Sequence, residues 1–428
     1  MSLERALLDG IASDGGLYLP QRLPQFVPED FSAAQSIQQV AQLYMTPYFE
    51  GSTLEGELQN ILAETLSFEI PGSPICIDGN TEAMLELFHG PTAAFKDVGA
   101  GFLAACFSRL NQGATASITI LVATSGDTGG AVAAAFDGRP GVRVVVLYPE
   151  GRVSDRQAHQ LTCWGDNVLS LAVQGSFDDC QSLVKAAMAD TALNQRHRFS
   201  SANSINIGRL LPQSIYYVDA SLRHYRKTGN KPGFIIPTGN LGNAFACIMA
   251  RESGIPIGDI VLATNMNTLI GDYLAGADWT PRASIQTLAS AMDVGNPSNM
   301  ERLQSVLGDA VALRRQIRVF SADDENIRQE IATIHKESGI AICPHTATAT
   351  FAYRQLAAKD RADKDWILVS TAHPAKFESI TEPLIGETIP LPEGLANILS
   401  KPSRYSIIEP TLQSLVMQLD GTPMTGHK

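Results

Sequence analysis

The amino-acid sequence predicts an α/β fold with two open α/β domains, mostly parallel sheets and a small N-terminal lobe. Apolar, β-branched runs recur along the chain, and each leads into a turn and then into helix-forming residues. Strands that are apolar on both faces and alternate with helices are typical of buried parallel sheets. At 428 residues, the chain is also too long for one compact core, which favours more than one domain.

The clearest predicted strands are 117–123, 142–148, 234–237 and 366–370, and three of the four end at loops with donors suited to a ligand. The first part, 1–75, holds short helical stretches with several prolines and predicts the N-terminal lobe. Segment 116–209 carries its own strand–helix alternation and predicts a smaller α/β domain, so that 76–115 and 210–428 form the larger one. Segment 390–402, with the sequence PLPEGLANILSKP, predicts a loose connection before a C-terminal helix.

Composition narrows the class of protein. The net charge of −12 argues against a nucleic-acid partner, because neutralising phosphates needs a basic surface. The six cysteines form no CxxC pair and the eight histidines no HExxH motif, so we expect reduced thiols, no metal and a cytoplasmic location. No apolar run approaches the roughly 20 residues of a membrane helix, so we expect no membrane partner.

Lys96 stands in an unusually apolar setting, within the stretch HGPTAAFKD that ends at Asp97. An amine held against apolar groups loses hydration, so its neutral form becomes accessible and attacks carbonyls. This is the requirement for a lysine that holds a carbonyl cofactor as a Schiff base. The alternative is a lysine at a helix start whose stem packs on apolar groups while its ammonium reaches water.

The loop 238–243, with the sequence TGNLGN, is the clearest of the glycine-rich turns that follow the predicted strands. Two glycines let the backbone approach a ligand, and the N–H groups that open the next helix point at it. This combination indicates a phosphate cradle. The loop matches neither the dinucleotide nor the nucleoside-triphosphate motif. The alternative is a tight strand–helix turn that needs a positive φ.

Three further polar sets follow strands or precede helices. The loop 125–130, SGDTGG, carries Asp127 and Thr128, although Asp127 taken alone favours a helix N-cap. Thr371 ends a predicted buried strand and is also a possible cap. The stretch 201–209, SANSINIGR, ends in an arginine and suits an acidic group, although surface loops often look similar. Together with Lys96, these sets fit pyridoxal phosphate and a second phosphate or carboxylate.

These motifs resemble the threonine synthase family, in its longer microbial and fungal branch, within the fold-type II (tryptophan synthase β-like) pyridoxal-phosphate enzymes. The similar blocks occur in family order along nearly the whole chain; they are 14–20, 87–97, 124–129, 201–209, 238–243, 289–293 and 371–377. The resemblance implies a carbon–oxygen lyase of threonine biosynthesis. Its reaction would convert O-phospho-L-homoserine and water into L-threonine and phosphate, by γ-elimination and β-addition of water.

The resemblance also implies a role for each residue that matches a family motif. Lys96 is the catalytic residue and holds the cofactor pyridoxal 5'-phosphate. Asp127 lies near the cofactor's ring hydroxyl, and Thr371 contacts the pyridine nitrogen. The cofactor's phosphate loop comprises Gly239, Asn240, Leu241, Gly242 and Asn243. The substrate's phosphate is held by Thr128, Asn203, Ser204 and Arg209.

The chain departs from the family pattern in two ways. Leu241 and Asn243 stand where Phe and Asp are commoner, which are mild changes in a loop that works through its backbone, and an N-terminal strand segment usual in the family is missing. Two alternatives stay open: another fold-type II lyase of the serine or threonine dehydratase kind, which needs no second phosphate site, and a threonine-synthase-like protein that binds phosphorylated ligands without turnover. We expect a small-molecule partner and a monomer or homodimer.

Overall fold

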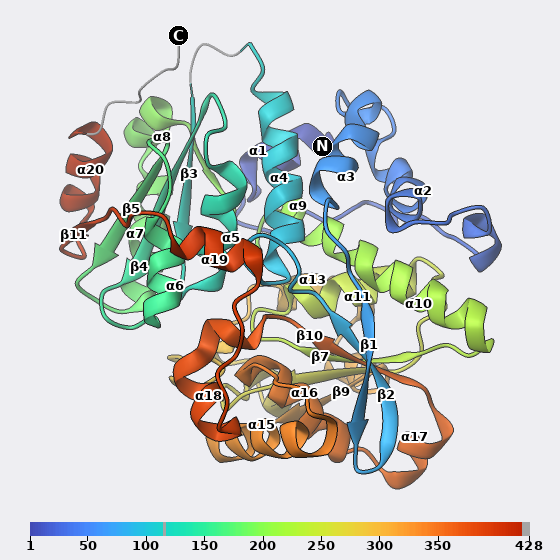
Figure 1. Ribbon diagram of the computed structural model, residues 1–428. Coiled ribbons are helices and arrows are strands. Elements are labelled where there is room, and N and C mark those ends of the chain that lie inside the picture. The colour runs from blue at the N-terminus through green and yellow to red at the C-terminus, as the bar shows by residue number, and fades with distance from the viewer. Residues whose placement is uncertain (114–116, 422–428) are drawn as a thin grey trace.

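The computed structural model describes residues 1–113 and 117–421, and its described strands form two sheets (Figure 1). The six-stranded sheet has the order β1-β2-β10-β7-β8-β9, with β1 Gly72–Ile77, β2 Asn80–Glu86, β7 Gly233–Pro237, β8 Ile260–Thr264, β9 Ile317–Ser321 and β10 Trp366–Ser370. The five-stranded sheet has the order β11-β5-β4-β3-β6, with β3 Ile118–Ala123, β4 Val142–Pro149, β5 Val168–Val173, β6 Phe199–Ser201 and β11 Ser406–Ile408. Within the described part, β1 and β2 pair antiparallel and the other named strand pairs are parallel, which confirms the predicted α/β class.

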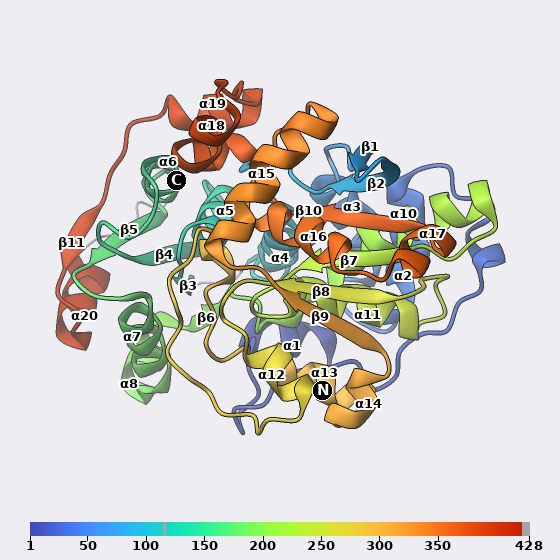
Figure 2. The same ribbon diagram turned by 90° about the horizontal axis from the view of Figure 1, so that it is seen from below.

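Helices cover both faces of each sheet (Figures 1 and 2). The first ten are α1 Leu3–Asp9, α2 Ile37–Phe49, α3 Leu58–Thr65, α4 Lys96–Leu110, α5 Asp127–Phe136, α6 Asp155–Thr162, α7 Phe177–Ala189, α8 Thr191–His197, α9 Ile207–Leu210 and α10 Ser214–Thr228. The others are α11 Gly242–Glu252, α12 Leu269–Ala275, α13 Met300–Leu307, α14 Ala310–Arg314, α15 Asp324–Ser338, α16 Pro344–Arg354, α17 Ala358–Asp363, α18 Glu378–Ile385, α19 Glu393–Leu399 and α20 Leu412–Gly421. The three short helices α1 to α3 build the N-terminal lobe against α4 and α10.

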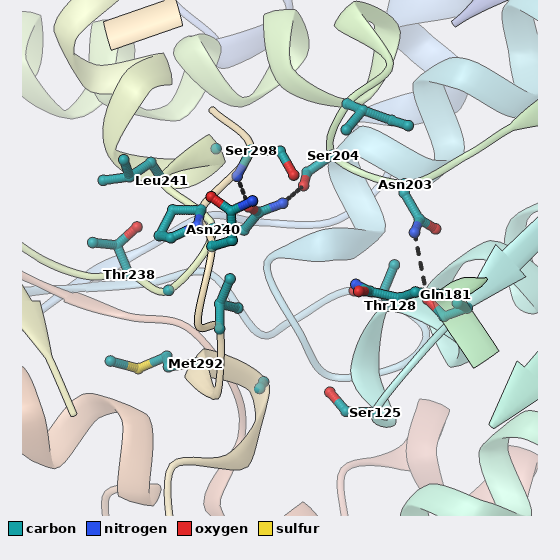
Figure 3. Close-up of a pocket in the computed structure, with 18 of the residues that line it drawn as sticks. Ser125, Thr128, Gln181, Asn203, Ser204, Thr238, Asn240, Leu241, Met292 and Ser298 are labelled. Atoms are coloured by element: carbon teal, nitrogen blue, oxygen red, sulfur yellow. Dashed lines mark hydrogen bonds between the residues drawn. The ribbon is translucent and has the colours of Figure 1, made fainter. Parts of the chain in front are cut away.

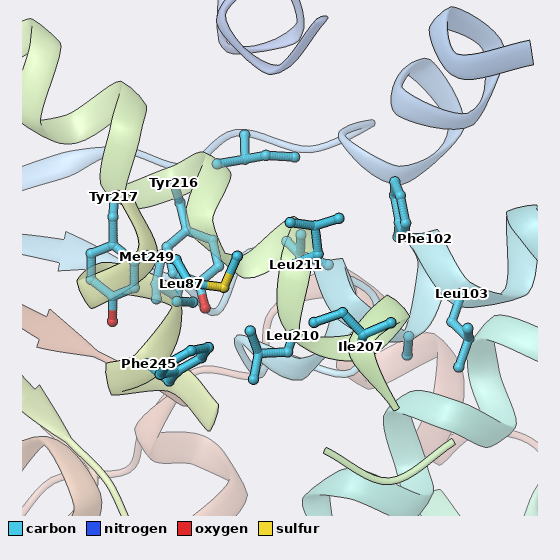
Figure 4. Packing of buried hydrophobic residues seen from close by; sticks show 14 of the residues in the cluster. Leu87, Phe102, Leu103, Ile207, Leu210, Leu211, Tyr216, Tyr217, Phe245 and Met249 are labelled. Atoms are coloured by element: carbon cyan, nitrogen blue, oxygen red, sulfur yellow. The ribbon is translucent and has the colours of Figure 1, made fainter. Parts of the chain in front are cut away.

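Both faces of the strands are buried, which explains their continuous apolar sequences. In β7, Phe234 and Ile236 belong to the core that α10 and α11 cover, whereas Ile235 belongs to the core under α15 and α16. Strands β3 and β4 of the five-stranded sheet are also buried on both faces. On one of these faces, Val145 packs against the residues of α7 and α20. The first core continues from the six-stranded sheet through α9, α10 and α11 to α4 (Figure 4). It therefore joins the two sheets and fixes the loops between them.

Two segments differ from the sequence prediction. Strand β11, near the C-terminus, pairs with β5 in the five-stranded sheet, although the sequence placed all of 210–428 in the larger domain. Segment 390–402 contains helix α19 and is not a loose connection: Pro390 and Pro392 precede the helix, Pro402 follows it, and its Leu395 and Ile398 are buried. The remaining division into domains stays a prediction. Among the described helices, none combines the length and apolarity needed to cross a membrane.

Candidate active site

A cavity of about 630 Å³ opens where loops at the carboxyl ends of strands from both sheets meet (Figure 3). Loops after parallel strands converge at one edge of a sheet, so ligands bind there in open α/β folds. The structure brings all the predicted site residues to the wall of this cavity: Lys96, Asp127, Thr128, Asn203, Ser204, Arg209, Gly239, Asn240, Leu241, Gly242, Asn243 and Thr371.

Lys96 is the first residue of α4, so it does lie at the start of a helix, as the alternative interpretation of a surface lysine expected. However, it lines the wall of the cavity. Its ammonium lies 4.6 Å from the ring centroid of Phe95. The Phe95 N–H donates to the Thr371 carbonyl (2.8 Å), and this bond ties the lysine loop to the end of β10. Burial lowers the pKa of Lys96, and this effect outweighs the opposing influence of Asp127. The neutral amine is therefore more accessible than on an exposed lysine.

Asp127 is the first residue of α5, and its carboxylate forms buried ion pairs. The N-cap of α5 is Gly126, which has no side chain, so the interpretation of Asp127 as the N-cap is wrong. Asp127 Oδ1 lies 2.8 Å from Lys376 Nζ, and Oδ2 lies 3.7 Å from Lys96 Nζ. Burial alone would raise the pKa of Asp127, but the two ammonium groups prevail and hold it well below the ordinary value. The group is an anion.

Lys376 was not identified from the sequence, although its motif block was. It lies in the short 3₁₀ helix Pro374–Phe377, and its side chain is 0% exposed. Besides pairing with Asp127, its Nζ donates to the carbonyl oxygen of Thr92 (2.8 Å). No local pattern marks this residue, because its partners come from two distant segments of the chain.

The loop after β7 has the geometry of a cradle. A Cβ added to Gly239 would lie 2.6 Å from the Cα of Met292, so the close approach there requires glycine. Leu241 adopts φ 62°, the left-handed conformation that a branched residue rarely takes. Helix α11 begins at Gly242, and its first N–H groups have no partners inside the helix. The loop therefore suits a ligand phosphate.

Side chains hold the cradle in place. Asn240 Nδ2 donates to Ser204 Oγ (2.6 Å), and the Ser298 N–H donates to Asn240 Oδ1 (2.6 Å), as Figure 3 shows. Asn243 Oδ1 accepts from the hydroxyls of Tyr216 (3.0 Å) and Tyr217 (2.7 Å). These contacts hold the loop through its side chains. None of them uses a backbone N–H group of the loop.

The second polar set contains a buried cation. Arg209 is 2% exposed, so it does not belong to a surface loop. Its Nη1 donates to the Ala202 carbonyl, and its Nε has no partner among the described residues. Burial lowers the pKa of Arg209 to about 10, still far above neutral. Asn203 and Thr128 line the same side of the cavity, and Figure 3 shows them on facing segments.

Arg302 and Asn299 were also missed from the sequence. Arg302 is fully buried and donates to the carbonyl oxygens of Ser204 (3.2 Å) and Ile205 (2.7 Å). Asn299 Nδ2 donates to the Asn240 carbonyl (2.9 Å). These two residues at the start of α13 therefore hold the loops of Ser204 and Asn240 at the cavity. They were not predicted because sequence motifs based on ligand contacts do not include residues that only support the loops.

The chain matches known proteins over nearly its whole length. Residues 79–372 match the family described as pyridoxal-phosphate dependent enzyme, 1–66 the threonine synthase N terminus and 346–418 the threonine synthase C-terminal region. The threonine synthase of Escherichia coli (strain K12) is 36% identical over 399 residues, which cover 92% of this chain and 91% of that protein.

Two solved structures share the fold at similar identity. The crystal structure of threonine synthase from Escherichia coli superposes with a TM-score of 0.89 at 33% identity, covering 99% of this chain and 97% of that one. The PLP-bound threonine synthase from Brucella melitensis gives a TM-score of 0.88 at 32% identity, covering 98% and 96%. The fold-type II fold predicted from the motifs is confirmed.

Proposed function

This chain belongs to the threonine synthase family of pyridoxal-phosphate-dependent enzymes, and we propose that its substrate is O-phospho-L-homoserine, which it converts with water into L-threonine and phosphate. The observation that carries the choice of substrate is Arg209. The buried guanidinium of Arg209 lines the cavity, and its described side-chain hydrogen bond goes to one neutral acceptor, the Ala202 carbonyl oxygen. An anion there offsets the cost of that burial. Because the 238–243 cradle serves the cofactor's phosphate, Arg209 is available for a phosphate on the substrate.

The residues of the cavity fit pyridoxal phosphate. Gly239 leaves room that a Cβ would fill, next to the free N–H groups that open α11. Lys96 offers an amine whose neutral form is accessible, and Thr371 offers a neutral hydroxyl at the end of β10. We assign Gly239, Asn240, Leu241, Gly242 and Asn243 to the cofactor's phosphate, and Lys96 to its carbonyl carbon.

When bound, pyridoxal phosphate delocalises the negative charge that develops on the substrate's carbon atoms. Once its amine is free, Lys96 would accept the proton from Cα, give that proton up to the bound ligand, and then accept one from Cβ. Arg209, Asn203, Ser204 and Thr128 hold the substrate's phosphate and donate to its oxygens as it leaves Cγ. Lys96 would then return protons to Cγ and Cα, while water would supply the hydroxyl that adds at Cβ and its remaining proton would go to the released phosphate.

The decisive experiment is turnover of O-phospho-L-homoserine by the pyridoxal-phosphate-loaded enzyme. We expect phosphate and L-threonine to form in equal amounts. A 2-oxo acid formed from L-serine or L-threonine, without reaction of the phosphorylated substrate, would instead identify a dehydratase. Cofactor binding with no turnover of either substrate would identify a ligand-binding protein.

We also propose a cytoplasmic location, supported by six cysteines that are all free in the structure. The enzyme acts as a monomer or homodimer in this proposal, and light scattering on the purified protein distinguishes the two.

A further inference from the structure

The carboxylate of Asp127 has two unequal oxygens. Oδ1 accepts from Lys376 Nζ (2.8 Å) and from Gln157 Nε2 (3.2 Å). Oδ2 lies 3.7 Å from Lys96 Nζ, which is beyond hydrogen-bonding distance. One oxygen is therefore bound to the protein behind the cavity, whereas the other is directed towards Lys96 at the cavity wall.

The surroundings of Asp127 do not by themselves favour a charge. Its side chain is 3% exposed, and the side chain of Lys376 is 0% exposed. A carboxyl group in such a place becomes protonated unless a cation compensates for the lost hydration. His345 on α16 supplies no charge, because burial lowers its pKa to about 4. Lys96 lies 3.7 Å from the carboxylate, whereas Lys376 lies 2.8 Å from it, so among the described residues Lys376 is the cation in direct contact with Asp127.

We propose that Lys376 is a positioning residue for Asp127: its ammonium holds the carboxylate ionised and fixed through Oδ1, so that Oδ2 faces the cavity as a hydrogen-bond acceptor. The anchor of Lys376 supports this assignment, because its Nζ also donates to the Thr92 carbonyl and so has a fixed direction. Lys376 holds the Asp127 carboxylate in this way in the protein without any ligand, so this role does not depend on the proposed substrate.

The charge state of Asp127 determines which kind of ligand group can form a hydrogen bond with its Oδ2. An ionised carboxylate accepts hydrogen bonds and has no proton to donate. A ligand group that meets Oδ2 must therefore be a donor. For pyridoxal phosphate, and here the inference rests on the proposed function, the ring hydroxyl next to Asp127 would supply the proton.

The first test measures the protonation state of Asp127 in the cofactor-free chain by infrared difference spectroscopy. Lys376→Gln keeps a hydrogen-bond donor but removes the charge. At neutral pH we expect this variant to gain, relative to wild type, the C=O stretch of one protonated carboxylic acid per chain, and Lys376→Gln/Asp127→Asn to lose it. The matched control is Lys364→Gln, which removes an exposed lysine that pairs with Asp259, and it should gain no band. A Lys376→Gln spectrum without the new band overturns the proposal.

The second test is a double-mutant cycle in the free energy of unfolding. Asp127→Asn leaves the buried Lys376 ammonium without its partner, and Lys376→Gln forces Asp127 to take up a proton, so Lys376→Gln/Asp127→Asn should be less destabilised than the sum of the two single variants. Destabilisations that add, or a double variant that is destabilised by more than the sum, contradict the proposal. This measurement remains decisive if Lys376→Gln folds poorly.

The third test uses the holoenzyme. With pyridoxal phosphate bound, Lys376→Gln should shift the cofactor's absorption band relative to wild type, whereas Lys364→Gln should not. An unshifted band in the loaded Lys376→Gln variant contradicts the acceptor role of Oδ2 towards the cofactor. If the infrared result holds but O-phospho-L-homoserine is not turned over, the proposed function fails while the role of Lys376 stands.

Discussion

Replacing Arg209 by methionine separates substrate binding from fold stability. The change removes the guanidinium while keeping a long side chain in a position that is 2% exposed. Each charge-assisted hydrogen bond to the substrate's phosphate contributes about 1.5–3 kcal/mol. Loss of one such bond lowers kcat/KM for O-phospho-L-homoserine by about 10- to 150-fold.

The stability of the fold should change much less. Removing a buried cation relieves a desolvation cost, whereas the Ala202 carbonyl loses the donor that Nη1 provides. The two contributions have opposite signs, so we expect the free energy of unfolding to change by less than about 2 kcal/mol. Urea unfolding measures this quantity, and equilibrium dialysis of pyridoxal phosphate should give wild-type affinity.

Two further variants complete the assay. Arg404 is a matched control, because its side chain is 62% exposed and pairs with Asp166 (3.2 Å), so Arg404→Met should stay within about twofold of wild-type kcat/KM. Arg209→Lys keeps the charge but loses the planar fork, and should give an intermediate loss. The reasoning is refuted if Arg209→Met keeps wild-type kcat/KM. A parallel loss of cofactor affinity would move Arg209 to the cofactor site.

Three other changes test the cofactor side of the cavity. Burial lowers the pKa of Lys96 below its ordinary value of 10.5, so reductive labelling by an aldehyde in the cofactor-free chain should select Lys96 and have its midpoint below pH 10.5. Asp127→Asn removes a charge that raises the pKa of Lys96, so it should lower the labelling midpoint further. If mass spectrometry finds the label on another lysine, the assignment of Lys96 is rejected. Gly239→Ala should weaken pyridoxal phosphate binding, because the new Cβ would lie 2.6 Å from the Met292 Cα, whereas Gly56→Ala, with nothing within 4 Å, should not. Thr371→Asp should shift the absorption of bound pyridoxal phosphate towards a protonated ring and raise side products; an unchanged spectrum places Thr371 away from the pyridine nitrogen.

Much of the fold could be predicted because the sheets are buried on both faces. The runs that became β3, β4, β7 and β10 are continuous and apolar, and each ends at a loop with a distinct composition. Strand β11 could not be predicted in this way. It is three residues long, lies at a sheet edge with Ile407 exposed, and depends on pairing with a distant strand.

The candidate site was predictable where a residue type is tied to a local requirement. Lys96 stood out through its apolar neighbours, and Gly239 through the turn that it permits. Lys376 and Arg302 gave no such sign, since an ordinary-looking lysine or arginine acquires its role only when distant carboxylate or carbonyl groups surround it. The sequence placed Asp127 in the right loop but left open that its partner is a second lysine.

The hydrogen bond from Asn240 to Ser204 directly joins the two loops to which we assign phosphate binding. A ligand that orders the 238–243 loop therefore also orients Ser204. A second anion that binds at Arg209 then loses less free energy to the ordering of Ser204. Thermodynamic linkage requires the effect to be reciprocal: the factor by which pyridoxal phosphate tightens inorganic phosphate at Arg209 equals the factor by which phosphate tightens pyridoxal phosphate. Through this one amide, occupancy of either loop favours occupancy of the other to the same extent.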